Sequence, residues 1–179
     1  MSRLILIRHC ASAGQWPDAP LTEAGAAAAE ALAERLAGLD PDAVYSSPYR
    51  RALNTLAPFA ALAGLPMTVD ARLKERVLAD RDLDDWLDEI RRSFADPDRR
   101  ASGGESLNDS QARALDALGE IAGRGHRLPV VASHGGVISA VLRAADPTFG
   151  FEDWRGLKNP DLFELSLPGG RLAGWRRLD

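Results

Sequence analysis

The stretch Leu4-Ile5-Leu6-Ile7, which runs directly into Arg8-His9, decides the class of fold. It is a short apolar run without polar alternation, and such runs are typical of strands that are buried on both faces of a parallel sheet. Val130-Val131-Ala132 has the same character, and residues 43–45 and 67–69 are weaker strand candidates. We therefore expect a parallel sheet that is covered on both faces.

Helical patterns separate the strand candidates. Thr22 is suited to cap a first helix, and Pro48 to take the first position of a second helix that extends to about residue 63. Ser106 with Asp109 resembles a capping box ahead of a longer apolar pattern. A further helix is predicted over Gly135–Ala145.

The end of the chain has a different pattern. Residues 162–167 and 171–177 flank Pro168-Gly169-Gly170, which predicts an antiparallel hairpin. Strands that alternate with helices imply a layered α/β protein. The predicted fold is an α/β, three-layer α/β/α sandwich with a mainly parallel central sheet and a C-terminal antiparallel hairpin.

Length and composition set the domain organisation. The chain has 179 residues, of which 45% are hydrophobic and 27% are charged, and these are values of a globular protein. We predict one domain over residues 1–179, with residues 80–105 as a candidate lid insertion. Within this insertion an apolar stripe at helical spacing predicts an amphipathic helix: Leu83, Trp86, Leu87, Ile90 and Phe94.

Charge and cysteine content narrow the function classes. The formal net charge of −4 removes the usual electrostatic reason for binding nucleic acid or an anionic membrane. Cys10 is the only cysteine, which excludes an internal disulfide framework and a multi-cysteine zinc module. No signal peptide or membrane span is recognisable, so we expect a cytoplasmic protein. A homodimer stays open, because the sequence does not encode a readable oligomeric state.

Histidines and arginines follow the strand candidates. His9 comes after the first apolar run and His134 after residues 130–132, while Arg50 and Arg51 come shortly after residues 43–45. Ligands of such α/β folds bind beyond the carboxyl ends of the strands. The sequence therefore predicts one site that contains two imidazoles and several guanidinium groups.

These residue types suit phosphoryl transfer. A neutral imidazole can attack phosphorus and form a phosphohistidine, which divides one slow displacement into two faster ones. Guanidinium groups neutralise the oxygens around phosphorus with paired hydrogen bonds, and they favour the unprotonated form of a nearby histidine. A helix that begins at Gly135 would add N–H donors at its N-terminus.

Taken in order, the motifs resemble the histidine phosphatase superfamily, which includes cofactor-dependent phosphoglycerate mutases and many small phosphatases. The family pattern is matched by six stretches that together span nearly the whole chain: Leu6-Ile7-Arg8-His9, Leu21-Thr22-Glu23-Ala24-Gly25, Ser46-Ser47-Pro48-Tyr49-Arg50-Arg51-Ala52, Leu73-Lys74-Glu75, Gly103-Gly104-Glu105-Ser106 and Ser133-His134-Gly135-Gly136.

The resemblance implies a role for each matching residue. His9 would be the phosphorylated nucleophile, and Glu75 the proton donor to the leaving oxygen and the base for water. The phosphoryl oxygens would be held by Arg8, Arg51 and His134, with phosphate contacts from Ser12, Gln15 and Gly135. The implied activity is metal-independent hydrolysis of phosphomonoesters of small metabolites, with no cofactor.

The sequence departs from the family pattern at two places. Cys10 stands where family members commonly have glycine, and the chain after Glu75 lacks the usual aromatic-Glu-Gly element. Glu105 and Asp80 therefore stay open as alternative general acids. An ion pair of Glu75 with Arg72 or Arg76 at the surface is the structural alternative for that carboxylate.

Competing functions are weighed against the same residues. Cysteine phosphatase chemistry needs arginine six positions after the cysteine, where this chain has Trp16. A zinc site from His9, Cys10 and His134 lacks the usual ligand spacing. A phosphoglycerate mutase-type phosphotransferase and a non-catalytic phosphate-binding regulatory domain remain as alternatives. The physiological substrate is left open, because specificity would depend on the lid and on residues 103–106.

Overall fold

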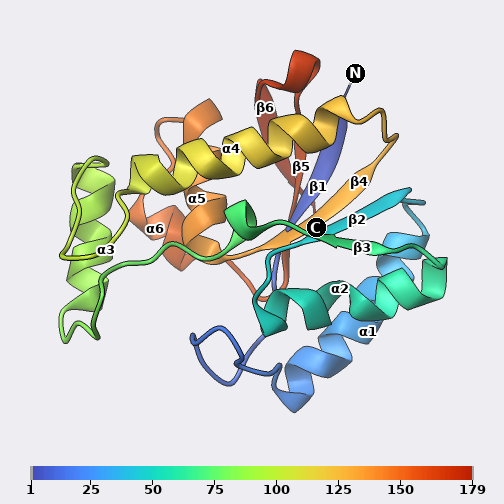
Figure 1. Cartoon of the computed structure of the whole chain (residues 1–179), viewed down its shortest axis with the longest axis horizontal. Helices are drawn as coiled ribbons and strands as arrows, with labels where there is room; N and C mark the ends of the chain where they lie inside the picture. The colour runs from blue at the N-terminus through green and yellow to red at the C-terminus, as the bar shows by residue number, and fades with distance from the viewer. Residues whose placement is uncertain (1, 179) are drawn as a thin grey trace.

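The computed structural model describes residues 2–178 as a six-stranded sheet covered by helices on both faces (Figure 1). The strands are β1 (Arg3–Arg8), β2 (Ala43–Ser46), β3 (Met67–Val69), β4 (Pro129–Ser133), β5 (Asp161–Ser166) and β6 (Gly174–Leu178). The α-helices are α1 (Glu23–Ala37), α2 (Arg50–Ala63), α3 (Trp86–Ala95), α4 (Leu107–Gly123), α5 (Gly135–Ala145) and α6 (Phe151–Arg155), with short 3₁₀ turns η1 (Ala71–Leu73) and η2 (Pro168–Gly170).

The strand order is β3-β2-β4-β1-β5-β6. The first four strands of this order run parallel, whereas β5 pairs antiparallel with β1 and β6 pairs antiparallel with β5. The predicted three-layer sandwich and C-terminal hairpin are confirmed. The hairpin completes the sheet on the side of β1 that faces away from β4.

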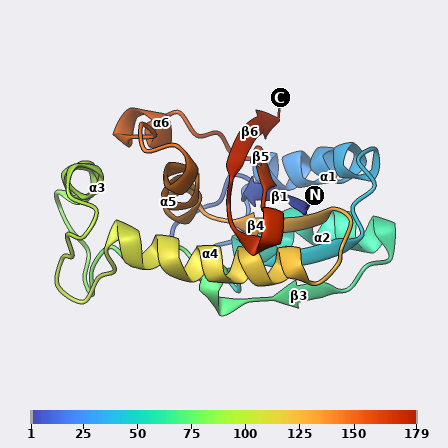
Figure 2. The same cartoon turned by 90° about the horizontal axis from the view of Figure 1, so that it is seen from above.

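The strand β1 is buried on both faces, as its unbroken apolar run indicates. Leu4 and Leu6 pack into one core cluster with α4 and α5, and Ile5 and Ile7 pack into a second cluster with α1 and α2. Figure 2 shows these helix pairs on opposite sides of the sheet. Because both faces are covered, ligands can reach this strand only at its ends.

Helix capping follows the sequence closely. The Thr22 hydroxyl accepts a hydrogen bond from the N–H of Gly25, and Ser106 and Asp109 form the expected capping box. The helix α5 begins at Gly135, as predicted. One boundary was wrong: α2 begins at Arg50 with Tyr49 as its cap, so Pro48 precedes the helix instead of opening it.

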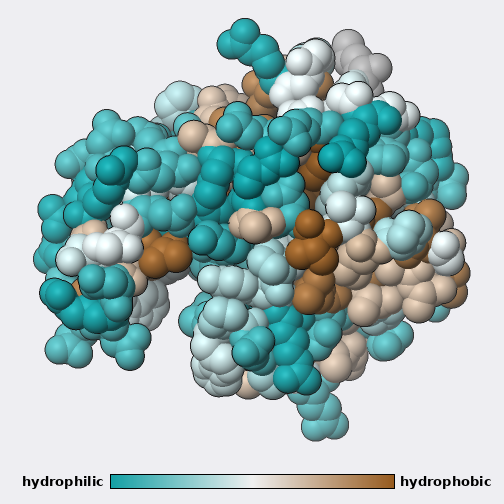
Figure 3. Space-filling view, in the orientation of Figure 1, coloured by the Kyte–Doolittle hydropathy of each residue, from teal (hydrophilic) through white to brown (hydrophobic). Residues whose placement is uncertain are grey.

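The helix α3 lies at one end of the molecule, away from the sheet (Figures 1 and 2). The predicted amphipathic helix is present, and its apolar stripe is partly covered: Phe94 packs against the core, whereas Trp86 is 51% exposed and Leu87 is 36% exposed. The buried residues of α3 are Glu89 and Ser93. Figure 3 shows a hollow in the surface between the lobe of α3 and the lobe formed by α1 and the segment before it.

Candidate active site

The two histidines meet at the carboxyl ends of neighbouring strands. In the β1–β4 pair Arg8 is opposite Ser133, so His9 and His134 leave the sheet side by side. The main-chain N–H of His9 donates to the Ser133 carbonyl at 3.1 Å. The imidazole centroids are 5.2 Å apart, and both side chains are buried.

The contacts of His9 define its tautomer. Its Nδ1 lies 2.7 Å from the Cys10 carbonyl oxygen. A carbonyl oxygen only accepts hydrogen bonds, so Nδ1 carries the proton. The other ring nitrogen, Nε2, accepts a 3.1 Å hydrogen bond from Arg51 Nε. The lone pair of His9 is therefore on Nε2.

The surroundings of His9 keep the ring neutral. Burial lowers the pKa of His9 to about 4, and the charges of Arg51 and Arg8 act in the same direction, against the hydrogen bond to the Cys10 carbonyl. The imidazole is thus unprotonated at neutral pH, which is the form that can act as a nucleophile.

Arg51 is fully buried at the start of α2. Its Nη1 donates to the carbonyls of Gln15 and Trp16, each at 3.0 Å, and its guanidinium lies over the Tyr49 ring. Arg50 is exposed. Of these two adjacent arginines, Arg51, which the family resemblance implies, is the one that contacts His9.

His134 is oriented by the segment before α2. Ser47 Oγ accepts a hydrogen bond from the Tyr49 N–H and lies 2.7 Å from His134 Nε2. When the Ser47 hydroxyl donates to Nε2, the proton of neutral His134 is on Nδ1. Burial holds the pKa of His134 well below its ordinary value, and the charge of Arg51 adds to the shift.

Three buried nitrogens of this cluster lack a hydrogen-bond partner: Arg8 Nε, Arg51 Nη2 and His134 Nδ1. They are the full set of such side-chain atoms within residues 2–178, and all three belong to residues that the sequence assigns to phosphate binding. Buried donors normally have partners, and an unpaired one costs about 1–3 kcal/mol. Unpaired donors on cationic and imidazole groups of one cluster are suited to an oxyanion.

Arg8 lies against the start of α5. A Cβ atom on Gly135 would lie 3.1 Å from Arg8 Nε, so glycine allows the guanidinium to approach the helix end. Arg8 Nη1 donates to the Leu157 carbonyl at 2.9 Å, which fixes the other side of the group. Burial lowers the pKa of Arg8, and the charge of Glu75 opposes that shift.

Glu75 contacts the N-terminus of α5. Its Oε2 accepts from the Gly136 N–H at 3.2 Å, and its Oε1 accepts from the Val137 N–H at 3.2 Å and from the Arg76 N–H at 2.8 Å. The surface ion pairs considered as an alternative are not among its contacts. The Arg72 side chain pairs with other carboxylates.

The other two carboxylates have different surroundings. Glu105 is bonded to Arg113 through both oxygens, at 2.7 and 2.9 Å. Burial by itself raises the pKa of Glu105, but hydrogen bonds from Arg113 and Val77 outweigh it and lower that pKa. Asp80 is exposed and contacts Ser102. Of the three candidates, Glu75 is the one at the helix end beside Arg8.

Two expected phosphate ligands make other contacts. The Ser12 hydroxyl donates to the Gly14 carbonyl at 3.0 Å. The Gln15 side chain is exposed, and this residue contributes its carbonyl oxygen to Arg51. Cys10 is buried in the core cluster that β1 forms with α1 and α2, so its thiol adds to the packing. Burial raises the pKa of this thiol.

Some contacts were not anticipated from the sequence. Ser47 and Tyr49 lie within the matched segment 46–52, where their roles toward His134 could have been sought. Asn159 donates from Nδ2 to the His9 carbonyl at 2.8 Å, although it is 150 residues away in the chain. No local pattern marks Asn159, so this contact depends on the tertiary fold.

Within residues 2–178, no group of three or more histidine, cysteine, aspartate or glutamate residues is arranged to hold a metal ion. In the same range, no helix combines the length and the apolar character needed to cross a bilayer.

Comparison with known proteins identifies the family. The model described as "Histidine phosphatase superfamily (branch 1)" matches residues 4–172. The chain belongs to this superfamily. The resemblance inferred from the order of the motifs is thereby confirmed.

Two curated members of the superfamily are similar over most of the chain. A glucosyl-3-phosphoglycerate phosphatase of Mycolicibacterium vanbaalenii is 32% identical over 165 residues, which cover 79% of this chain and 73% of that protein. A 2,3-bisphosphoglycerate-dependent phosphoglycerate mutase of Methylobacterium radiotolerans is 32% identical over 169 residues, which cover 80% of this chain and 78% of that protein.

A solved histidine phosphatase has the same architecture. The structure of a mycobacterial glucosyl-3-phosphoglycerate phosphatase in complex with inorganic phosphate superposes with a TM-score of 0.80 at 28% identity. The match covers 100% of this chain and 96% of that one. The match therefore includes residues 80–105 as well as the sheet.

Proposed function

We propose that this histidine phosphatase hydrolyses phosphomonoesters of small metabolites through a phosphohistidine on His9. One observation carries the proposal: an unprotonated, buried His9 Nε2 lies in the same cluster as three buried nitrogen donors that lack a partner. Family membership and similarity to a phosphatase support hydrolysis as the reaction.

In the first step, the Nε2 lone pair attacks phosphorus and the bond from phosphorus to the leaving oxygen breaks. The charge on the equatorial oxygens is balanced by Arg8 and Arg51 and stabilised by a hydrogen bond from neutral His134, through the three unpaired nitrogens. Glu75 gives its proton to the leaving oxygen, which departs as an alcohol. The Cys10 carbonyl holds Nδ1–H and so supports the positive charge that develops on the ring.

In the second step, Glu75 is a carboxylate and removes a proton from water. The water oxygen bonds to phosphorus, and the electron pair of the N–P bond returns to His9 Nε2. Inorganic phosphate is released, and Glu75 is protonated again for the next cycle. No net proton is left on the site, so the two steps balance.

The substrate class is supported by the surroundings of the site. The phosphoryl group would be held by the histidine and arginine cluster, and the organic part would face the hollow bounded by α3 (Figure 3). We assign residues 80–105 as the lid that contacts this part. A phosphorylated metabolite with a sugar or glycerate moiety is the first choice for a substrate panel, because the similar mycobacterial protein is a glucosyl-3-phosphoglycerate phosphatase.

The decisive experiment measures phosphate release from p-nitrophenyl phosphate and from a metabolite panel. We expect the wild type to turn over and His9→Ala to lose activity by at least about a thousandfold, because the nucleophile is removed. His126→Ala is the matched control, because His126 contacts Tyr45 and lies outside the cluster. Quenching with denaturant at alkaline pH should preserve an acid-labile phosphoryl group on the wild type and on His126→Ala, but not on His9→Ala.

Two outcomes would favour other functions. Binding of inorganic phosphate without turnover of any phosphomonoester between pH 5 and 8 would indicate a phosphate-binding regulatory domain. Transfer of phosphate to 3-phosphoglycerate without net release would indicate a mutase, an activity that one similar protein has in its name.

A further inference from the structure

The segment that carries Glu75 has no regular secondary structure. It follows η1, and residues 75–79 are neither helix nor strand. A backbone without a hydrogen-bonded ladder is positioned by contacts from its neighbours. The position of Glu75 therefore depends on what holds residues 72–77.

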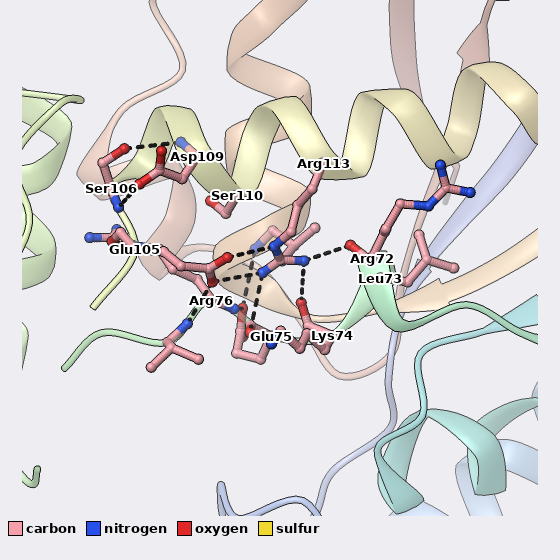
Figure 4. Close-up of polar contacts among 12 residues, drawn as sticks. Arg72, Leu73, Lys74, Glu75, Arg76, Glu105, Ser106, Asp109, Ser110 and Arg113 are labelled. Atoms are coloured by element: carbon pink, nitrogen blue, oxygen red, sulfur yellow. Dashed lines mark hydrogen bonds and ion pairs between the residues drawn. The ribbon is translucent and has the colours of Figure 1, made fainter. Parts of the chain in front are cut away.

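Arg113 holds this segment from the second turn of α4 (Figure 4). Its Nη1 donates to the carbonyls of Arg72 and Lys74, at 2.5 and 2.9 Å, and its Nη2 donates to the Glu75 carbonyl at 3.3 Å. One guanidinium thus contacts three carbonyls within four consecutive residues. A planar group with five donors can make such contacts, and a lysine cannot reproduce them.

Glu105 fixes both the arginine and the segment. Its carboxylate pairs with Arg113, and the side chains of Glu105 and Arg113 are only 22% and 17% exposed. Its Oε2 also accepts from the Val77 N–H at 3.0 Å, and its own N–H donates to the Val77 carbonyl at 2.7 Å. Glu105 directly precedes the capping box of α4, so these contacts are anchored on the helix.

The adjacent residue adds a further link. Arg76 Nε donates to the Glu105 carbonyl at 3.1 Å, and its Nη1 donates to Ser93 Oγ at 2.8 Å. The chain before Glu75 is therefore tied to α4 through Arg113, and the chain after it to Glu105 just ahead of α4, while the Glu75 carboxylate reaches the N-terminus of α5.

We propose that Arg113 and Glu105 are positioning residues for proton transfer by Glu75. They fix its main chain, so that the carboxyl group remains at the end of α5 beside the phosphoryl group. This inference rests on the proposed function of Glu75. Displacement of a reacting group by about 1 Å can cost a hundredfold in rate, so such anchoring has a measurable effect on catalysis.

The test uses the dependence of rate on the leaving group. Aryl phosphates have leaving groups that need little protonation, whereas alkyl phosphates need a general acid. Glu75→Gln serves as the reference and should lower kcat/KM, which reports the leaving-group step, on an alkyl phosphate by about a hundredfold more than on p-nitrophenyl phosphate. Arg113→Met should shift this alkyl-to-aryl ratio of kcat/KM in the same direction by about tenfold.

Arg72→Met is the matched control. Arg72 also links the segment to α4, through Glu120, and pairs with Asp70, but its guanidinium makes none of the contacts to residues 74–77. Its alkyl-to-aryl ratio should equal that of the wild type. Glu105→Gln, which keeps the size of the side chain, provides a second variant and should behave as Arg113→Met does.

A double-mutant cycle separates positioning from general damage. If Arg113 acts through Glu75, then Arg113→Met combined with Glu75→Gln should have nearly the same alkyl-to-aryl ratio as Glu75→Gln alone. The inference would be overturned if the double variant combined the full effects of both single substitutions on the alkyl-to-aryl ratio. It would also be overturned if Arg113→Met and Glu105→Gln both kept the wild-type ratio. Thermal unfolding identifies variants that do not fold. If Arg113→Met does not fold, the alkyl-to-aryl ratio of Glu105→Gln decides whether the inference holds.

The failure of this inference differs from the failure of the proposed function. If the wild type hydrolyses both substrates and Glu75→Gln has the leaving-group effect, a wild-type ratio in folded Arg113→Met and Glu105→Gln contradicts the positioning role alone. A lack of wild-type turnover, or a Glu75→Gln variant without the leaving-group effect, contradicts the assignment of Glu75 itself.

Discussion

The His9 imidazole is held between a carbonyl acceptor and a guanidinium donor, and these two contacts assign its proton to Nδ1. Burial and the nearby cations lower its pKa to about 4. The residues around His9 thus set both the charge of its ring and the nitrogen that carries the lone pair. An isolated histidine, with a pKa near 6.5, would be partly protonated at neutral pH.

We predict that His9 stays neutral from pH 8 down to about pH 5 and becomes protonated near pH 4. Nitrogen-15 shifts of the imidazoles, measured by NMR across this range, should report an Nδ1–H tautomer for His9. The His9→Asn spectrum assigns the signals. Protonation of His9 near pH 6.5 would contradict the electrostatic account.

At the scale of residues, the sequence predicted identities better than contacts. The order of the motifs picked out His9, Arg51 and His134, because each follows a strand whose apolar run is recognisable. The contacts of Ser12 and Gln15 could not be predicted, because they depend on how residues 11–20 fold back toward α2. The choice among three carboxylates also required the tertiary structure.

The start of α1 shows how an element is fitted to the site. Thr22 donates its N–H to the Ala11 carbonyl at 3.0 Å, and a Cβ atom on Gly25 would lie 2.0 Å from that same oxygen. Gly25 is therefore needed for the close approach of α1 to the segment that follows His9. This contact gives the glycine of the Leu-Thr-x-x-Gly motif a structural reason.

We predict that Gly25→Ala destabilises the protein by about 1–3 kcal/mol, because the obstructing atom belongs to the backbone and cannot move cheaply. For a chain of this size the melting temperature should fall by about 2–4 °C per kcal/mol. Gly123→Ala is the control, since a Cβ atom there would meet nothing within 4 Å. Equal melting temperatures of the two variants would refute the packing explanation.

The helix α3 forms where an amphipathic helix was predicted, but the spacing alone did not say which of its residues are buried. Phe94 packs against the core, Trp86 and Leu87 are exposed, and the buried positions are Glu89 and Ser93. Glu89 is paired with Arg92 and Arg99, and Ser93 contacts Arg76. Periodicity assumes that the apolar face meets a core, and α3 lies beyond the end of the sheet (Figure 1). By contrast, β1 lies inside the sheet, and its pattern predicted its burial correctly.

For the molecule as a whole, two buried neutral histidines couple stability to pH. The folded-state pKa values of His9 and His134 lie below the ordinary histidine value. Between about pH 6.5 and 4 the unfolded chain therefore binds more protons than the folded one. Stability is fully present above about pH 6.5 and is lost as the pH falls.

We predict that His9 alone accounts for a loss of about 3 kcal/mol in the free energy of unfolding between pH 6.5 and pH 4. Urea titrations at several pH values, in buffers without phosphate, measure this slope. The free energy of unfolding of His9→Asn should depend less steeply on pH than that of the wild type. The control His126→Ala should have a steeper dependence than His9→Asn. Identical slopes for the wild type and His9→Asn would disprove the coupling.

The three unpaired buried donors have a consequence for regulation and for inhibitor design. In the proposed function they bind the phosphoryl group, which ester and released phosphate share, so the two compete for one binding site. Accumulated orthophosphate should therefore slow turnover competitively, whatever alcohol is attached to the ester. Selectivity among metabolites must then come from parts of the ligand that never touch these nitrogens.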